Sequence, residues 1–279
     1  MITIIIVTYN RTEKLKRLLS SLRLQTFKEF EVLIINDYSE QLILARYDFT
    51  IKIIENGNAD LWWAESVNEG LKYTLNSKSS HILILNDDII IDESYLFEAI
   101  NFEKSHPNSI QGPIIFDLAD AEKLWAVGGF ISWPFKGPYH NLTLNNKSEF
   151  TEVQWLPGMG TFFKKNILTD VGLMNSRIHP QYLSDTDFTL TAKSLGFPIL
   201  VNHKLKLYNE TTSTGGIISK QNLSFSDVKD IFLHKSSPEY FNSRISFMKD
   251  HTKSILEFIL SVLIHYLRLF MFISKKILF

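Results

Sequence analysis

The 279-residue sequence contains no cysteine. This absence excludes disulfide bonds, thiolate metal sites and cysteine nucleophiles. The sequence also lacks a basic excess, because 29 lysines and arginines are balanced by 30 acidic residues and the formal net charge is −1. Nucleic-acid binders usually need such an excess, so we expect no nucleic-acid partner. With 45% hydrophobic and 21% charged residues, the composition indicates a globular protein and excludes a disordered chain, a collagen-like fibre and a multi-pass transporter.

The first ten residues lack the features of an export signal. The apolar run Ile2–Val7 has no basic region before it and no small-residue cleavage site after it. A run of β-branched residues closed by Thr8, Tyr9 and Asn10 is typical of a buried strand. We therefore expect the fold to start here and the protein to be cytoplasmic.

Strand and helix patterns alternate along the first 100 residues. Further buried strands are predicted at residues 31–36, 51–54 and 81–85, and helices at residues 63–76, 93–104 and around the leucine stripe 15–22. This alternation predicts right-handed βαβ units and an α/β fold with a mainly parallel sheet. Beyond a region of short strands and irregular loops at about 107–160, helices are predicted at 165–171 and 185–195, and short strands at 199–202 and 205–208.

Polar residues close four of the predicted strands. They are Tyr9 with Asn10, Asp37, Asn56, and the pair Asp87–Asp88. The carboxyl ends of parallel strands meet at one edge of a sheet, where the ligands of α/β proteins bind. Each residue alone would be an ordinary turn residue, but together they predict a ligand site.

The pair Asp87–Asp88 is the sharpest local feature. Two carboxylates at a strand end suit Mg²⁺ or Mn²⁺, which prefer oxygen ligands and often bridge substrate phosphates. The alternative is a strand-to-helix turn, where aspartate is common. Because the other strand ends are polar too, we favour the metal site.

Two other strand ends have the chemistry of a nucleoside site. Asp37 could accept a hydrogen bond from a base imide or a ribose hydroxyl, and Thr8, Tyr9, Asn10 and Arg11 offer hydroxyls, an aromatic ring and a cation. The alternatives are a simple turn at Asp37 and a helix cap formed by Asn10 or Thr12.

A second carboxylate site is expected where the predicted helix 185–195 begins. Asp185 could act as a general base that takes a proton from an attacking hydroxyl, and the helix N-terminus would stabilise its charged form. Helix capping is the alternative, and for Asp187 we favour it. Trp133 and Trp155 are candidates to stack on a sugar, although packing is the commoner role of such residues.

The order of these features resembles the inverting family 2 glycosyltransferases of the GT-A fold, from residue 2 to about residue 215. The matching segments are Ile4–Arg11, Glu31–Asp37, Asn56 with Trp63–Gly70, Leu85–Asp88, Trp155–Thr161 and Tyr182–Phe188. Each motif alone is weak, but six in the family's order and spacing form a specific pattern. Two of the motifs have particular forms here, Leu61–Trp63 and Trp155–Gly158. These forms look most like those of bacterial enzymes that build surface polysaccharides, including rhamnosyltransferase-like members.

The resemblance implies a GT-A Rossmann-like fold, with a mainly parallel sheet, helices on both faces and a C-terminal helical extension. The glycosyltransferase domain would cover residues 1–220, with a nucleotide-binding half at about 1–105 and an acceptor half at about 106–220. The helical extension would cover residues 221–279.

The resemblance also implies an inverting transfer from a nucleotide-diphosphate sugar to a glycan or lipid-linked acceptor, assisted by Mg²⁺ or Mn²⁺. To the donor it assigns Thr8, Tyr9, Asn10, Arg11, Asp37, Asn56, Asn68 and Asp87. To the metal it assigns Asp88 and Asp87, and to the acceptor Trp155, Gly158 and the accessory acid Asp187. Asp185 would be the catalytic base.

Two positions depart from the family pattern. The family usually has an arginine in the helix after the base, where this chain has Thr191, Ala192 and Lys193. Many members also have a late histidine that helps to hold the metal or the diphosphate, and here Asn209 or His203 would take that place. These departures motivate an alternative, a non-catalytic nucleotide- or carbohydrate-binding protein on a decayed fold. A sugar nucleotidyltransferase is disfavoured because no Gly-rich basic loop follows the first strand.

The C-terminal tail carries a polar stripe in an otherwise apolar segment. Its members follow one another at steps of three or four residues and are Lys249, Lys253, Glu257, Ser261, His265 and Arg268. The spacing predicts one long helix, and its length would suffice to span a membrane. Because charged residues lie within it, we favour a helix in the membrane interface, which would make the protein peripheral on the inner face of the cell membrane and bring it to a lipid-linked acceptor. The alternatives are packing on its own domain or across a homodimer.

Overall fold

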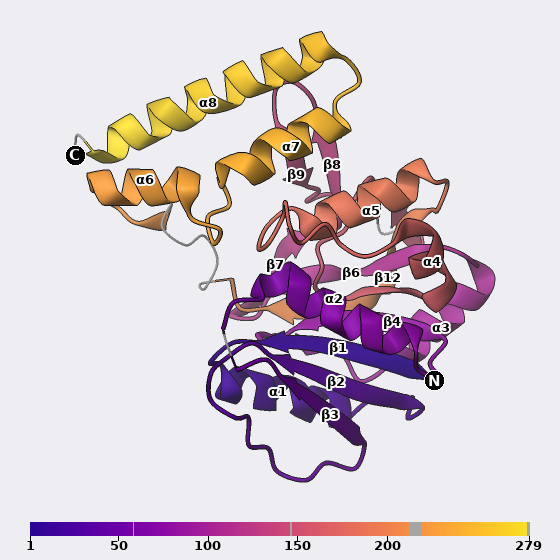
Figure 1. The fold of residues 1–279 in the computed structure, drawn as a ribbon. Coiled ribbons are helices and arrows are strands. Elements are labelled where there is room, and N and C mark those ends of the chain that lie inside the picture. The colour runs from indigo at the N-terminus through magenta and orange to yellow at the C-terminus, as the bar shows by residue number, and fades with distance from the viewer. Residues whose placement is uncertain (58, 146, 212–218, 278–279) are drawn as a thin grey trace.

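A ten-stranded sheet forms the centre of the protein, as the computed structural model shows (Figure 1). The structure describes residues 1–57, 59–145, 147–211 and 219–277. The strands of this sheet are β1 (Ile2–Thr8), β2 (Phe30–Asn36), β3 (Thr50–Glu55), β4 (His81–Asn86), β5 (Ile89–Ile91), β6 (Ile110–Asp117), β7 (Asp120–Ala126), β10 (Phe150–Glu152), β11 (Thr161–Lys164) and β12 (Ile199–Asn209). A separate hairpin pairs β8 (Gly129–Ser132) with β9 (Gly137–His140).

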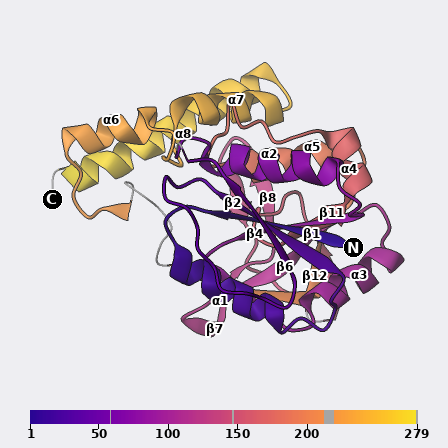
Figure 2. The same ribbon diagram turned by 60° about the horizontal axis from the view of Figure 1, so that its bottom comes forward.

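Eight helices surround the sheet within the described residues. They are α1 (Thr12–Arg23), α2 (Trp62–Leu75), α3 (Tyr95–Ser105), α4 (Lys165–Val171), α5 (Ser184–Ser194), α6 (Phe225–Leu233), α7 (Phe241–His251) and α8 (Ile255–Ile277). One core cluster joins α1 and α3 to one face of the sheet, and a second joins α2, α4 and α5 to the other face. Figure 2 shows α1 and α2 on opposite sides of the strands.

The first four strands form a fully parallel part of the sheet in the order β3-β2-β1-β4. Strands β1 and β2 are almost entirely buried, as expected for runs of β-branched and other apolar residues covered on both faces. In the rest of the sheet, β12 is parallel to β6, whereas β11 is antiparallel to both β4 and β6. The α/β architecture with a mostly parallel sheet and helices on both faces confirms the prediction.

Two details near the end of β12 differ from the prediction. The two short strands expected at 199–202 and 205–208 are one strand, β12, whose register against β6 shifts between Val201 and Lys206. The chain also does not turn directly into a helix after Asp88, because β5 first pairs with the end of β12. This pairing sets Asn209 opposite Ile89, beside the acidic pair.

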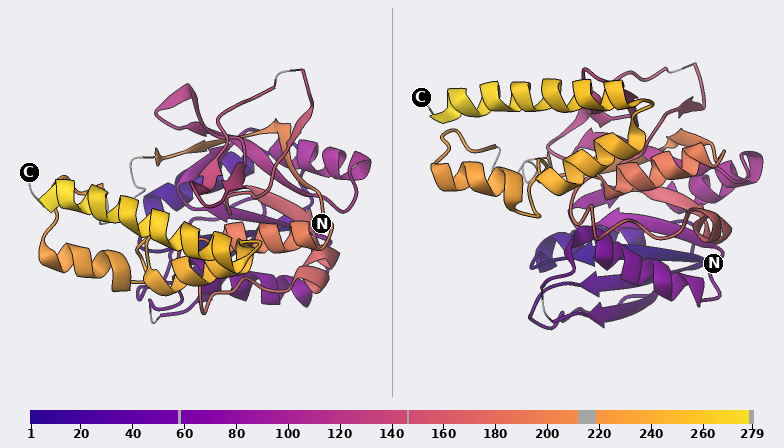
Figure 3. Two further views of the ribbon diagram at one scale, coloured as in Figure 1. Left: turned by 90° about the horizontal axis from the view of Figure 1, so that it is seen from above. Right: turned by 45° about the horizontal axis from the view of Figure 1, so that its top comes forward.

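The C-terminal helices form a separate layer above the sheet (Figures 1 and 3). The single long helix expected from Lys249 onward is wrong, because α7 ends at His251 and α8 begins at Ile255. The backbone N–H of Glu257 donates to Ser254 Oγ (3.1 Å), and the Glu257 carboxylate accepts from the N–H of Lys253 (2.6 Å). These bonds cap the start of α8 and separate it from α7.

The polar stripe of α8 faces the protein. Ser261 is fully buried, His265 Nε2 lies 2.7 Å from Glu239 Oε2, and the Arg268 guanidinium donates to the carbonyl of Phe135. The alternative of packing on its own domain is therefore correct for this stripe. The opposite face exposes apolar side chains, which include Ile255, Leu256, Ile259, Leu260, Leu263, Leu267, Phe270 and Met271. Within the described residues, α8 is the one helix whose length and composition would allow it to cross a membrane.

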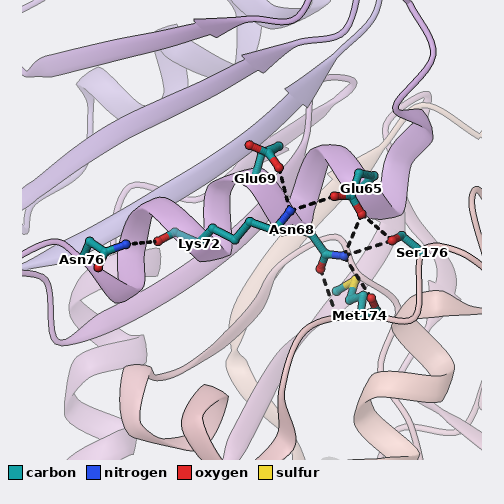
Figure 4. Close-up of polar contacts among 7 residues, drawn as sticks. All are labelled: Glu65, Asn68, Glu69, Lys72, Asn76, Met174 and Ser176. Carbon is teal, nitrogen blue, oxygen red and sulfur yellow. Dashed lines mark hydrogen bonds and ion pairs between the residues drawn. The ribbon is translucent and has the colours of Figure 1, made fainter.

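Helix α2 is clamped to the loop before α5 by Asn68 (Figure 4). The Asn68 amide donates to the carbonyl of Met174 (2.9 Å) and to Ser176 Oγ (3.3 Å), and its oxygen accepts from the N–H of Met174 (2.9 Å). Glu65 accepts hydrogen bonds from both Asn68 and Ser176. Asn68 thus connects the two halves of the chain from a buried position.

We expect Asn68→Ala to lower the free energy of unfolding by roughly 1–3 kcal/mol, because buried polar groups of Met174 lose their partners. Equilibrium urea unfolding followed by circular dichroism measures the change. Asn76→Ala, directly after the same helix, is the matched control. The Asn76 amide donates to the Lys72 carbonyl at an exposed site, so this variant should lower the free energy of unfolding by less than about 0.5 kcal/mol. Equal stabilities for the two variants would show that the clamp contributes nothing.

Candidate functional site

A cavity of about 400 Å³ opens at the carboxyl ends of β1, β2 and β4, and we call it the strand-end cavity. It is lined by Val7, Tyr9, Arg11, Asp37, Ala59, Trp62, Trp63, Ser66, Asn86, Asp87, Gln181, His234 and Ser236. Four of the residues assigned to the donor therefore meet here, as expected for parallel strands that end at one edge. Tyr9 is exposed at the rim, where its ring meets the edge of Tyr38 at 5.3 Å between centroids.

Asp87 of the acidic pair lines the strand-end cavity, and both carboxylates of the pair are buried. Thr8 Oγ1 donates to Asp87 Oδ2 (2.8 Å), and one nitrogen of Arg11 reaches Asp87 Oδ1 (3.4 Å) and Asp88 Oδ2 (3.0 Å). Burial, and then the charge of Asp88, raises the pKa of Asp87 to about 6. The pair therefore needs positive charge, and Arg11 supplies part of it.

Asp88 has one oxygen of the kind that a hard cation binds. Asp88 Oδ1 is buried without a hydrogen-bond partner among the described residues. The side-chain nitrogen of Asn209 is also buried without a partner there, but only the side-chain oxygen of an asparagine can bind a cation. The N–H of Glu210 donates to the carbonyl of Asp88 (3.3 Å), which holds the end of β12 against the pair. His203 lies elsewhere, since its ring nitrogens contact Thr151 Oγ1 (2.8 Å) and the Ser148 carbonyl (2.7 Å). Of the two late candidates, the structure brings Asn209 to the acidic pair.

Asp37 shapes the wall of the strand-end cavity. Its carboxylate accepts from Asn56 Nδ2 (2.6 Å) and from the backbone N–H groups of Leu61 (3.2 Å) and Trp62 (3.1 Å). Asn56 thus acts through Asp37 and does not line the cavity. Asp37 therefore has the turn role stated as an alternative for the sequence, and it also lines the strand-end cavity.

A second cavity of about 390 Å³ adjoins the first, and we call it the Asp185 cavity. Both cavities are lined by Arg11, Trp63, Asn86 and Gln181, so they meet at these four residues. Asp88, Trp155, Gly158 and Asp185 line the second one. Asp185 Oδ2 accepts from the N–H of Gly158 (2.8 Å) and Oδ1 from the N–H of Thr186 (2.8 Å). Burial raises the pKa of Asp185, although these hydrogen bonds partly oppose the effect.

Gly158 occupies a position that tolerates no side chain. A Cβ there would lie 2.3 Å from the Trp63 ring and 3.4 Å from the Asp185 side chain. The Trp63 indole in turn donates to Asn86 Oδ1 (2.9 Å), at the end of β4. The close approach of Trp63 to the Gly158 backbone therefore links Asp185 to the strand that carries the acidic pair.

Several predicted site residues lie outside both cavities. Asp187 Oδ1 is 2.7 Å from His251 Nε2 and so holds α7, and Trp133 donates to the carbonyl of the same His251 (2.9 Å). Lys193 binds Glu152 (2.9 Å) and the Val153 carbonyl (3.0 Å), so it does not replace the family's arginine at the site. Neither Asn10, which has a left-handed backbone (φ 52°), nor Asn68 lines a cavity.

Other lining residues were not anticipated from the sequence. Gln181 accepts from the N–H of Trp63 (3.2 Å) and joins the two cavities. His140 lies between Trp125 (4.4 Å between centroids) and Trp155 (5.0 Å), and burial lowers its pKa to about 4. The C-terminal helical layer contributes further residues to the cavities, namely His234 and Ser236 to the first and Pro238 and Arg244 to the second. No local pattern marked His140 or the residues of the helical layer, because they come from a hairpin and an extension distant in sequence from the predicted strand ends.

Comparison with known proteins gives consistent matches. The sequence profile described as "Glycosyl transferase family 2" matches residues 3–172. An "uncharacterized glycosyltransferase" of Haemophilus influenzae is 37% identical over 90 residues, which are 32% of this chain and 29% of that protein. The crystal structure of GalNAc-T7 with UDP, GalNAc and Mn²⁺ has a TM-score of 0.62 at 13% identity, over 75% of this chain and 43% of that one. Staphylococcus aureus TarS has a TM-score of 0.60 at 17% identity, over 99% of this chain and 54% of that one.

This chain thus spans about half, or less, of the length of each of these proteins. The two solved structures share its fold, as expected for a GT-A domain. Because the family profile matches more than half of the sequence, in the region that carries the acidic pair, the chain belongs to glycosyl transferase family 2.

Proposed function

We propose that this glycosyltransferase transfers a sugar, with inversion, from a nucleotide-diphosphate sugar to a hydroxyl group of a glycan or lipid-linked acceptor. One observation carries the proposal: the Asp87–Asp88 pair and Asp185 line two cavities that share four residues. The strand-end cavity would hold the donor and the Asp185 cavity the acceptor. The transferred sugar would then lie where the two meet, beside Arg11 and Trp63.

Asp185 is the proposed general base. Its carboxylate would take the proton of the acceptor hydroxyl while that oxygen forms a bond to the anomeric carbon. The bond from the anomeric carbon to the diphosphate oxygen breaks on the opposite face, and the electron pair leaves with the nucleoside diphosphate. The hydrogen bonds from Gly158 and Thr186 fix the orientation of the carboxylate, and its raised pKa makes it a better base.

Asp88, with Asp87 and Asn209 nearby, would hold Mg²⁺ or Mn²⁺. When bound, such an ion neutralises charge that develops on the leaving diphosphate. The unpartnered Asp88 Oδ1 supports this assignment, and a structural relative contains Mn²⁺ and UDP. Arg11 would contact the diphosphate from the rim of the same cavity.

The exposed apolar face of α8 supports attachment to a membrane. A helix that turns its polar stripe to the protein and its apolar side chains outward would lie flat in the bilayer interface, with the core domain on the cytoplasmic side. This placement suits synthesis of surface polysaccharide on lipid-linked acceptors. It makes the protein peripheral and monotopic without requiring α8 to span the bilayer.

We expect Asp185→Asn to lower turnover by about 10²–10⁴-fold, the usual contribution of a general base, with nucleotide binding unchanged. Release of nucleoside diphosphate from a panel of nucleotide sugars, with Mn²⁺ present, measures turnover. Asp170→Asn, at the exposed end of α4, is the control. Because burial raises the pKa of Asp185, wild-type activity should fall as the pH drops through that pKa. Binding without any diphosphate release by the wild type would instead favour the non-catalytic alternative.

Replacing Asp88 tests the metal site. We expect Asp88→Asn to weaken Mn²⁺ binding in the presence of UDP by more than about tenfold, since one charged ligand is lost. Isothermal titration with Mn²⁺ and UDP measures the affinity, and Asp120→Asn on the exposed strand β7 is the control. Unchanged Mn²⁺ affinity in Asp88→Asn would refute the assignment.

Two leucines on α8 test membrane attachment. Leu263 and Leu267 are 61% and 60% exposed, so replacing both with glutamine should leave the fold intact and reduce vesicle binding by at least about tenfold. Co-flotation with phosphatidylethanolamine–phosphatidylglycerol vesicles measures binding. Leu24 and Leu142, 59% and 62% exposed on other parts of the surface, provide a matched double control. If both double variants float like the wild type, α8 is not the attachment site.

A further inference from the structure

A third cavity of about 240 Å³ lies between the β8–β9 hairpin and helices α7 and α8, and we call it the hairpin cavity. Figure 1 shows the hairpin rising beside α7 toward α8. The bonds from Trp133 to the His251 carbonyl and from Arg268 to the Phe135 carbonyl hold the three elements together.

The hairpin cavity is basic. Lys136, Arg244, His265 and Arg268 line it, and Glu239 is the one acidic residue among its described lining. Glu239 is already paired with Arg244 (3.1 Å) and His265 (2.7 Å). Neither Lys136 nor Arg268 forms an ion pair with a described acidic side chain, since Lys136 lies over the Tyr139 ring and Arg268 contacts a carbonyl. These two exposed cations at one small cavity thus have no ion-pair partner among the described side chains, and together they would attract an anion there.

The position of this cavity indicates which anion it takes. Arg244 and Pro138 line both the hairpin cavity and the Asp185 cavity, so the two are neighbours. Arg268 projects from α8, the helix whose opposite face exposes apolar side chains. An anionic group in the hairpin cavity would therefore have the proposed base on one side and the proposed membrane surface on the other.

We propose that the hairpin cavity binds the phosphate or diphosphate group of a lipid-linked acceptor. This inference rests on the proposed function, because it names the acceptor class of the same site. The acceptor sugar extends past Arg244 toward Asp185, and the lipid chain leaves along α8 into the bilayer. Lys136 and Arg268 contact the phosphate oxygens, while Glu239 holds Arg244 and His265 in place. The cavity thus selects acceptors that carry a phosphate at the junction of lipid and sugar.

The test compares Lys136→Gln/Arg268→Gln with Lys249→Gln/Lys253→Gln. The control pair removes the same charge from exposed positions near the junction of α7 and α8, outside the cavity. Phosphatidylcholine vesicles doped with a prenyl diphosphate are the probe, and tryptophan fluorescence reports binding, since Trp133 lines the cavity. We expect the cavity variant to bind doped vesicles at least about tenfold more weakly than the wild type and the control variant by less than about twofold.

Two outcomes would overturn the inference. Equal losses in both variants would mean general attraction to negative surfaces. The second outcome uses vesicles doped with phosphatidylglycerol in place of the prenyl diphosphate. If the cavity variant loses as much binding to these vesicles as to the first kind, the cavity binds bulk lipid head groups. Competition by inorganic pyrophosphate in solution gives a readout that needs no vesicle binding, so it separates failure of this site from failure of the α8 attachment. UDP binding and Asp185-dependent turnover of the wild type test the proposed function separately.

Discussion

The site is organised around two adjacent buried carboxylates, Asp87 and Asp88, at the end of the central strand β4. Like charges that are close together and removed from water repel each other strongly, so the pair is tolerated only beside positive charge. Arg11, which follows β1, supplies one charge, and the proposed divalent cation at the unpartnered oxygen of Asp88 would supply more. An anionic diphosphate placed against this cation and Arg11 would then balance the site. The charge of the pair thus accounts for Arg11, for the proposed metal and for the class of donor.

The C-terminal helical layer completes the site that the sheet begins. Its His234 reaches the strand-end cavity, where the ring meets Trp62 at 5.7 Å between centroids, and its Arg244 reaches the Asp185 cavity. Glu239 accepts from Arg244 and lies within hydrogen-bond distance of His265, so it connects the second cavity to α8. Asp187, two residues after the proposed base, contacts His251 and docks the layer on α5. The helical layer therefore supplies side chains to the cavities on which both proposals depend.

Much of the site could be predicted because parallel strands end at one edge. Runs of β-branched residues marked β1 to β4, and polar residues after them, including Arg11, Asp37 and Asp87, line one cavity in the structure. Roles that depend on the direction of a side chain could not be predicted. On a helix, Asp185 and Asp187 point about 200° apart, so one lines the cavity and the other faces α7. Asn68 likewise turns toward the Met174 loop, because that loop needs partners for its buried backbone groups.

Helix α8 shows a further limit of sequence patterns. Spacing at three and four residues reveals a polar stripe, but the same spacing fits a stripe that faces water and one that faces protein. The direction is decided by tertiary partners. Glu239 contacts His265, the Phe135 carbonyl accepts from Arg268, and Ser261 is buried on the side of α8 that faces the protein. In water, the outward apolar face would leave a large area of hydrocarbon unburied, at about 25 cal/mol per Å². An outer face of this kind is favoured where something other than water covers it, and the proposed membrane surface would provide that cover.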